Sequence, residues 1–356
     1  MNLDRFKTLN IKPLIAKNPA VPRDSSKLMV LHRNSGKIEH CVFRDIVNYF
    51  NAGDCLVLNN SKVFPAKLPA KKSTGGKTEI LLVRPCDTSK SASVSPDVAT
   101  SRWLCLTPQC RAGLEIILQG GVKATAIGKS EDGYWIFEFT TGNILSYADK
   151  YGVMPLPPYI EKARKKSGDE IFSQSDGKNY QTVYAGVTGS IAAPTAGFHF
   201  TDELIEAIKQ KGVKVAFVTL HVGWGTFRPV KTAPQKHQML AEFAEISAQN
   251  ADIINDVKKS GGKIFSTGTT ATRTLEGFAD ENCRVTSGKK WVDLFIYPPY
   301  KFKIIDFLIT NFHVPGHTPI CLTQALAGEE FLFKAYKQAV EKKYRFYSFG
   351  DAMLIL

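Results

Sequence analysis

Residues 180–201 read YQTVYAGVTGSIAAPTAGFHFT and contain no Asp, Glu, Lys or Arg. Gly and Ala bury almost no side chain, so we expect this segment to build little core and to let a ligand approach its backbone N–H groups and hydroxyls. The helical pattern TDELIEAIKQKG follows at once, with Thr201 as the expected N-cap. A polar loop that leads into a helix N-terminus suits a ligand with negative charge or carbonyl oxygens. An ordinary glycine-rich connection is the alternative.

Similar segments recur towards the C-terminus, each at the end of an expected strand. In α/β proteins ligands bind where the ends of strands open into loops, so several loops of one type predict one composite site. The segments are HVGWGTFRPV (221–230), STGTTATRTLEG (266–277), ITNFHVPGHTP (309–319) and FGDAMLIL (349–356).

The composition is that of a globular protein, with 356 residues, 44% hydrophobic and 22% charged residues. This length favours two domains. No apolar run reaches the roughly 18–20 residues of a membrane span, and the first residues lack the apolar core of a signal peptide, so we expect a cytoplasmic protein. We also expect a monomer. The seven cysteines form no C-x-x-C pair and the seven histidines no H-E-x-x-H motif, so no metal site is predicted.

A net charge of +13 favours a polyanionic partner, because Lys and Arg neutralise phosphates and release counterions. For any single basic cluster a merely solvated surface is the better interpretation, but their sum favours nucleic acid. The candidate phosphate contacts are Lys71, Lys72, Lys162, Arg164, Lys165 and Lys166.

The pattern of expected helices and strands changes twice along the chain, and this predicts a discontinuous α/β domain interrupted by an all-β insertion. Residues 1–66 and 151–356 alternate helix and strand patterns, whereas residues 67–150 contain short β-rich runs separated by turn signals. Runs of this kind predict a small antiparallel barrel or sandwich. The Ser-rich piece 86–101 is expected to be an exposed loop.

Periodicity in the C-terminal part places helices at 202–211, 248–259 and 329–343, with Ser247 as the N-cap of the second. Strands are expected near 213–221, 263–267, 291–297 and 304–310.

Taken together, the motifs resemble those of the S-adenosylmethionine:tRNA ribosyltransferase-isomerases of queuosine biosynthesis over nearly the whole chain. Besides the segments quoted above, the matching stretches are RDSSKLMVL, GDCLVLNNSKVFPAKL, STGGKTEILL, YGVMPLPPYI and YRFYSFGDAMLIL. The resemblance implies an α/β domain with an inserted β-barrel domain.

The resemblance also implies a chemistry. The family moves and isomerises the ribosyl unit of S-adenosylmethionine onto 7-aminomethyl-7-deazaguanine at a tRNA wobble position. Epoxyqueuosine-tRNA, adenine and methionine are the products. S-adenosylmethionine would be a consumed co-substrate, no cofactor would be needed, and the partner would be tRNA that carries the deazaguanine precursor.

Such a reaction needs a base to remove a proton beside the sulfonium and an acid to assist the departure of adenine. Histidine suits both tasks, so His199, His221 and His313 are the leading candidates, with fixation of a loop as the alternative for each. Glu242 is a further candidate for the base or for pairing with the sulfonium. Which group is acid and which is base stays open.

The remaining candidates would bind substrate oxygens or charges. Arg273 is expected to bind the methionine carboxylate or a tRNA phosphate, or else to pair with Glu276, and Asp351 is expected to bind a ribose hydroxyl. The polar and glycine positions of the same motifs complete the set: Ser190, Thr195, Gly197, Thr226 and Asn311.

Two positions depart from the family pattern. Leu240 stands where many relatives have a second His, and His317 stands where relatives usually have Ser. The altered His317 loop keeps two alternatives open: a diverged paralogue that acts on a free nucleoside or another modified base, and a non-catalytic RNA-binding module. The retained motifs weigh against loss of catalysis.

Overall fold

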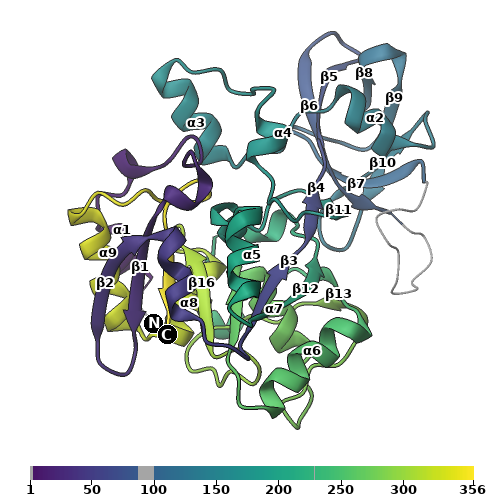
Figure 1. Ribbon diagram of the computed structural model, residues 1–356. Coiled ribbons are helices and arrows are strands. Elements are labelled where there is room, and N and C mark those ends of the chain that lie inside the picture. Colours follow the sequence, from purple (N-terminus) through teal and green to yellow (C-terminus); the bar gives the residue numbers. More distant parts are fainter. Residues whose placement is uncertain (1–2, 87–99, 228) are drawn as a thin grey trace.

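We analysed a computed structural model that describes residues 3–86, 100–227 and 229–356. Most of the Ser-rich piece expected to be an exposed loop lies outside the described residues. Figure 1 shows a larger α/β part and a smaller β-rich part beside it.

The larger part is built on a mixed sheet in the strand order β15-β13-β12-β3-β14-β16-β17-β1-β2. Its middle strands β12, β3, β14 and β16 run parallel to one another, and the first strand of the chain pairs in parallel with the last. The strands are β1 (Lys27–His32), β2 (Lys37–Val42), β3 (Cys55–Asn59), β12 (Lys214–Leu220), β13 (Glu242–Ile246), β14 (Ile264–Thr267), β15 (Gly288–Val292), β16 (Phe307–Asn311) and β17 (Ala352–Ile355).

Both faces of this sheet are covered, because alternate side chains of a strand point to opposite faces. On β3, Cys55 and Val57 join one buried cluster while Leu56 and Leu58 join another. Helices α6 and α7 pack on the middle strands, and α5 contributes to the second cluster. The helices are α1 (Asp4–Lys7), α2 (Ile144–Tyr151), α3 (Pro158–Ser167), α4 (Asp176–Asn179), α5 (Asp202–Gln210), α6 (Ala248–Lys259), α7 (Gly268–Gly277), α8 (Thr318–Ala327) and α9 (Glu329–Glu341).

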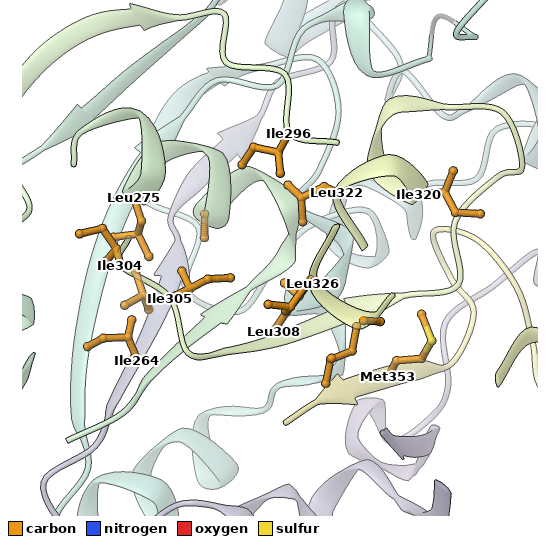
Figure 2. Close-up of a cluster of buried hydrophobic side chains, with 14 of the residues drawn as sticks. Ile264, Leu275, Ile296, Ile304, Ile305, Leu308, Ile320, Leu322, Leu326 and Met353 are labelled. Atoms are coloured by element: carbon orange, nitrogen blue, oxygen red, sulfur yellow. The ribbon is translucent and has the colours of Figure 1, made fainter. Parts of the chain in front are cut away.

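Figure 2 shows part of the first cluster, in which aliphatic side chains of strands, helices and loops face one another. Leu308 on β16 and Met353 on β17 lie near Leu322 and Leu326 of α8. Each fully buried aliphatic side chain of this kind contributes about 1.5–3 kcal/mol relative to exposure. This packing holds β16 and α8, and with them the loop that joins them.

The smaller part is a closed antiparallel barrel in the order β10-β7-β6-β5-β8-β9, which confirms the predicted fold class. Its own core includes Trp103, Phe137 and Ile80, and α2 adds Ile144 and Ala148. The domain boundaries at 66/67 and 150/151 stay predictions. The barrel strands are β5 (Lys67–Lys72), β6 (Lys77–Pro85), β7 (Arg102–Leu106), β8 (Glu115–Leu118), β9 (Lys123–Lys129) and β10 (Trp135–Phe139).

Residues 180–201 lie at the junction of the two parts. Within them β11 (Val187–Ser190) pairs in parallel with β4 (Ser61–Val63), and Figure 1 shows this pair between the main sheet and the barrel. The expectation that this segment builds little core is wrong. It contributes to every described buried cluster through Ala192, Ile191, Phe200 and the group Tyr180, Ala193 and Phe198.

Most predicted elements of the C-terminal part form, and the two predicted N-caps are confirmed. The Thr201 hydroxyl accepts from the Leu204 N–H, and the Ser247 hydroxyl accepts from the Asn250 N–H. The bounds of the strand expected at 291–297 are wrong, because β15 begins at Gly288 and ends at Val292. Helix α8 was not predicted, since its residues are buried almost all round and show no amphipathic period.

Candidate active site

A cavity of about 310 Å³ lies where β14 and β16 end, next to the short 3-10 helix η5 (Thr195–His199). Its volume falls in the range of small-molecule sites. Segments from six of the stretches that resemble the family line it, and Lys162 of α3 adds to them. The lining residues that carry polar groups are Tyr159, Lys162, Tyr180, Thr195, Trp224, Thr269, Thr270, Thr310, Asn311, His313, His317, Tyr347 and Ser348.

A chain of hydrogen bonds runs from the wall of this cavity into the protein. The Thr195 hydroxyl donates to Asn311 Oδ1 at 3.0 Å, and Asn311 Nδ2 lies 3.1 Å from His199 Nε2. With Nε2 as the acceptor, the His199 Nδ1–H donates to the Ser26 hydroxyl at 2.7 Å. Thr195 and Asn311 line the cavity, whereas His199 is 3% exposed and lies behind them. His199 therefore orients Asn311 and does not itself face a ligand.

Burial lowers the pKa of His199 to about 3, and the positive charges of Arg345 and Arg23 act in the same direction. The imidazole also packs against the Phe43 ring, with ring centroids 4.9 Å apart. Burial therefore keeps the ring neutral near pH 7. Because His199 lies behind the cavity wall and binds Asn311, its geometry is that of a positioning residue, and its expected acid–base role stays a prediction.

His313 is the candidate histidine that lines the cavity. Its Nε2 lies 2.6 Å from the Thr310 hydroxyl, and its backbone N–H donates to the Tyr336 hydroxyl at 2.7 Å. Burial, and secondarily the neighbouring His317, lower the pKa of His313 well below that of free histidine. Within the described residues Nδ1 has no hydrogen-bond partner. His313 thus presents a neutral imidazole with an acceptor or donor position left for a ligand.

His221 belongs to a separate buried network next to the cavity. Its Nδ1 lies 2.8 Å from the Ser61 hydroxyl, which lies 2.6 Å from the Ser190 hydroxyl. Ser190 in turn accepts from the Val222 N–H at 2.8 Å. Val222 lines the cavity, but His221 and Ser190 do not. The expected direct roles of His221 and Ser190 are corrected, because both side chains hold the loop that carries Val222.

Glu242 and Arg273 form a buried ion pair; Glu242 is 4% exposed and Arg273 is 6% exposed. Glu242 Oε1 also accepts from the Gly223 N–H at 2.9 Å, and Arg273 donates to the carbonyls of Leu294 and Val292. Neither side chain lines the main cavity, although Arg273 borders a side cavity of about 20 Å³. The predicted contacts of Glu242 and Arg273 with substrate are therefore corrected. The two side chains bind each other and nearby backbone groups, and so support the wall of the cavity.

The alternative partner that the sequence offered for Arg273 is occupied elsewhere. Glu276 accepts from the backbone N–H groups of Lys303, Ile304 and Ile305, so it fixes a loop. Arg273 pairs with Glu242, 31 residues away in sequence.

Asp351 does not face a ligand either. This carboxylate is 1% exposed and accepts from the Arg345 guanidinium at 2.8 and 3.0 Å and from the backbone N–H of Arg345 at 2.8 Å. The expected contact with a ribose hydroxyl is wrong, because Asp351 is committed to the turn that precedes β17.

Gly197 has a packing role. A Cβ at this position would lie 2.0 Å from the Tyr184 hydroxyl oxygen and 2.8 Å from Thr182 Cγ2. Gly197 does not line the cavity, so its absence of a side chain serves close approach to Tyr184 and not to a ligand. The side chain of Thr226 lies outside the described residues.

Of the basic candidates, Arg164 is placed in the interior. It is 3% exposed and forms a bidentate pair with Asp176, with both N–O distances at 2.8 Å. Its other donors bind the carbonyls of Ile171 and Lys17 and the Asn18 side chain. The prediction that Arg164 binds phosphate is wrong, because its guanidinium is buried and committed.

The other basic candidates remain accessible. Lys71, Lys162, Lys165 and Lys166 are exposed, and Lys72 is half-buried with its ammonium 3.3 Å from Gln109 Oε1. Lys71 and Lys72 lie on β5 of the barrel, and the other three lie on α3. Lys162 alone among these lines the cavity.

Four residues that line the cavity were not predicted from the sequence as site residues: Tyr159, Tyr180, Trp224 and Ser348. Tyr159 on α3 lies 2.5 Å from the Ser348 hydroxyl, and Tyr180 lines the same wall. Trp224 connects the cavity to the barrel, because it also packs against the barrel core. The PLPPY and FYSFGD stretches in which Tyr159 and Ser348 lie were recognised as motifs, but no signal separated these two residues from core residues.

Two features are absent from the described residues. Among the described residues, no group of His, Cys, Asp and Glu side chains is arranged to bind a metal ion. In the same part of the chain, no helix has the length and apolar character needed to cross a bilayer.

Comparisons with known proteins agree on one family. The sequence model of a family described as "Queuosine biosynthesis protein" matches residues 6–355. The S-adenosylmethionine:tRNA ribosyltransferase-isomerase of Thermoanaerobacter sp. (strain X514) is 46% identical over 350 residues, 96% of either chain. The crystal structure of S-adenosylmethionine tRNA ribosyltransferase from Thermotoga maritima is similar over 98% of both chains, with 34% identity and a TM-score of 0.52.

Proposed function

The chain belongs to the queuosine biosynthesis protein family, and from this premise we propose that it is an S-adenosylmethionine:tRNA ribosyltransferase-isomerase. It transfers and isomerises the ribosyl unit of S-adenosylmethionine onto 7-aminomethyl-7-deazaguanine at the wobble position of tRNA. The products are epoxyqueuosine-tRNA, adenine and methionine.

The observation that carries this proposal is the convergence of separate motifs on one cavity. Thr195, Thr270, Asn311 and His313 come from three segments that match the family, and all of them line the same space. Residues this far apart in sequence meet there because η5, α7 and the loop after β16 stand at the same edge of the sheet.

The cavity has polar groups for the charged and hydroxyl parts of S-adenosylmethionine and an apolar surface for its adenine ring. The N-termini of α7 and α8 border it through Gly268, Thr269 and Pro319, and such ends favour the methionine carboxylate. Trp224 and the neighbouring alanines offer an apolar surface for the adenine ring. We assign the binding of ribose oxygens to Thr195 and Asn311, because both side chains line the cavity.

His313 is the residue we assign to proton transfer at the carbon beside the sulfonium. The assignment rests on geometry, because His313 lines the cavity and its Nδ1 has no hydrogen-bond partner among the described residues. Burial lowers the pKa of His313, so the ring is neutral before the reaction and has a lone pair to accept this proton, but it is a weaker base than a free imidazole. S-adenosylmethionine is consumed as a co-substrate, and no further cofactor takes part. We expect the protein to act as a cytoplasmic monomer.

The test uses S-adenosylmethionine labelled separately in the ribosyl and methionine parts. The protein should release free adenine and methionine only with tRNA that carries the deazaguanine precursor, and ribosyl label should enter that tRNA. Unmodified tRNA and the free deazaguanine base serve as controls. Formation of S-adenosylhomocysteine, which would signal methyl transfer, contradicts the proposal, as does turnover on the free base.

A further inference from the structure

Helix α3 forms one rim of the cavity and carries a single charge into it. Pro158, Tyr159 and Lys162 line the space, and within the described residues Lys162 is the only Asp, Glu, Lys or Arg that does so. Lys162 is exposed, so its ammonium stands at the mouth and not at the floor. Among the described residues it has no ion pair or hydrogen bond, whereas Lys67 nearby is paired with Glu79 and Glu161.

The helix that carries Lys162 is fixed on several sides. Arg164 ties it to Asp176 and to the N-terminal segment, and Tyr159 ties it to Ser348. Glu161 pairs with Lys67 of the barrel at 3.0 Å. Because side chains of α3 anchor it to four parts of the fold, the helix presents the Lys162 side chain at a defined place on the rim.

Lys162 begins a row of cations that leads away from the cavity. Lys165 and Lys166 follow it by three and four residues, which places them on the same side of the helix, and both are exposed and outside the cavity. A small carboxylate ligand would be met by one cation and by the helix ends deeper in the cavity. A row that continues outside fits a polyanion, part of which enters.

We propose that Lys162 binds the backbone phosphate next to the acceptor nucleotide when its base enters the cavity. The inference rests on the proposed function and adds to it the contact that places the acceptor. Lys165 and Lys166 attract the RNA in general, whereas Lys162 holds one phosphate at the rim, which sets how far the deazaguanine reaches in.

The experiment measures equilibrium binding of an anticodon stem-loop that carries the precursor base, to the wild type and to Lys162→Gln. A second stem-loop has an uncharged methylphosphonate in place of the phosphate next to the acceptor nucleotide. Lys165→Gln on the same helix is the matched control, and a methylphosphonate three nucleotides away is the control for the RNA.

Lys162→Gln should weaken binding of the normal stem-loop by ~10-fold or more, as expected for loss of a charge-assisted hydrogen bond. The salt dependence of its binding should become shallower by about 0.7 in log–log slope, the value for one phosphate contact. The adjacent methylphosphonate should weaken wild-type binding equally and leave Lys162→Gln unchanged. The distant methylphosphonate and Lys165→Gln should give independent, additive effects.

Additive losses for Lys162→Gln and the adjacent methylphosphonate would overturn the inference. So would a higher KM for S-adenosylmethionine with unchanged RNA binding, which would place the methionine carboxylate at Lys162. Because binding needs no turnover, wild-type protein that binds the stem-loop but releases no adenine would contradict the proposed function alone.

Discussion

At the scale of single residues, the site depends on which polar groups face the cavity and which stand behind it. His199 and His313 both lie in motif loops, and burial lowers the pKa of each. Of the two, His313 lines the cavity, while both ring nitrogens of His199 are hydrogen-bonded, one to Ser26 and the other to Asn311. The two histidines should therefore fail in different ways when they are replaced.

We predict that His199→Ala lowers the free energy of unfolding and that His313→Ala mainly lowers turnover. Loss of His199 leaves Ser26 and Asn311 without their buried partner, at about 1–3 kcal/mol for each group. Loss of an acid–base group at His313 should reduce kcat by ~10²–10⁴-fold. Chemical denaturation and single-turnover kinetics measure the two effects. A fully stable but inactive His199→Ala protein would return His199 to the catalytic set.

Gly197→Ala should destabilise the protein through Tyr184, by about 1–3 kcal/mol as for other overpacked sites. The Tyr184 hydroxyl is buried and has no hydrogen-bond partner among the described residues. Tyr184→Phe alone should therefore cost little, and it should recover part of the stability lost by Gly197→Ala because it removes the nearest atom. Thermal unfolding of the two single variants and the double variant tests this; equal losses with and without the Tyr184 hydroxyl would exclude the clash.

At the scale of elements, α3 connects the cavity, the barrel and the N-terminal segment. Its sequence KARKK suggests a uniformly basic surface, yet Arg164 turns inward and binds Asp176 while Lys165 and Lys166 stay exposed. A helix of ten residues can carry both faces because neighbouring residues are rotated by about 100°. The inward cation anchors the helix, and the outward ones remain available to RNA.

Asp176→Asn should lower the free energy of unfolding by about 3–5 kcal/mol, because it leaves the Arg164 charge buried without its partner. Lys165→Ala, one residue from Arg164, should stay within about 0.5 kcal/mol of the wild type. Urea denaturation compares the two. If Asp176→Asn were as stable as Lys165→Ala, the pair would not anchor α3.

At the scale of the whole molecule, the burial of His199 contributes to the dependence of stability on pH. The pKa of His199 is about 3 in the folded protein and about 6.5 in the unfolded chain. Between these values the unfolded state binds a proton that the folded state does not, so stability falls as the pH falls below about 6.5. The contribution of His199 is fully present above that pH.

We predict that His199 accounts for a loss of about 2 kcal/mol in the free energy of unfolding between pH 8 and pH 5. The measurement is urea denaturation across this range for the wild type and His199→Gln. The variant is less stable throughout, but its pH dependence should be shallower by this amount. Parallel curves for the two proteins would show that His199 titrates normally in the folded state.

The sequence by itself determined the local elements and the family. The N-caps Thr201 and Ser247 work as predicted because a cap and its N–H partner are three residues apart. The short β-rich runs of residues 67–150 and the turn signals between them are likewise local, so the inserted β-barrel followed from them. The motif set identified the reaction because it spans nearly the whole chain.

Only the tertiary structure decided which motif residues reach the cavity. The partners of His199 are Ser26 and Asn311, 173 and 112 residues away, and Glu242 meets Arg273 across 31 residues. Nothing local distinguishes a buried, paired histidine or arginine from one that faces a ligand, because the energy that sets its role comes from burial and from distant partners. The same reason turned Arg164 inward while Lys162, two residues earlier, stands at the mouth of the cavity.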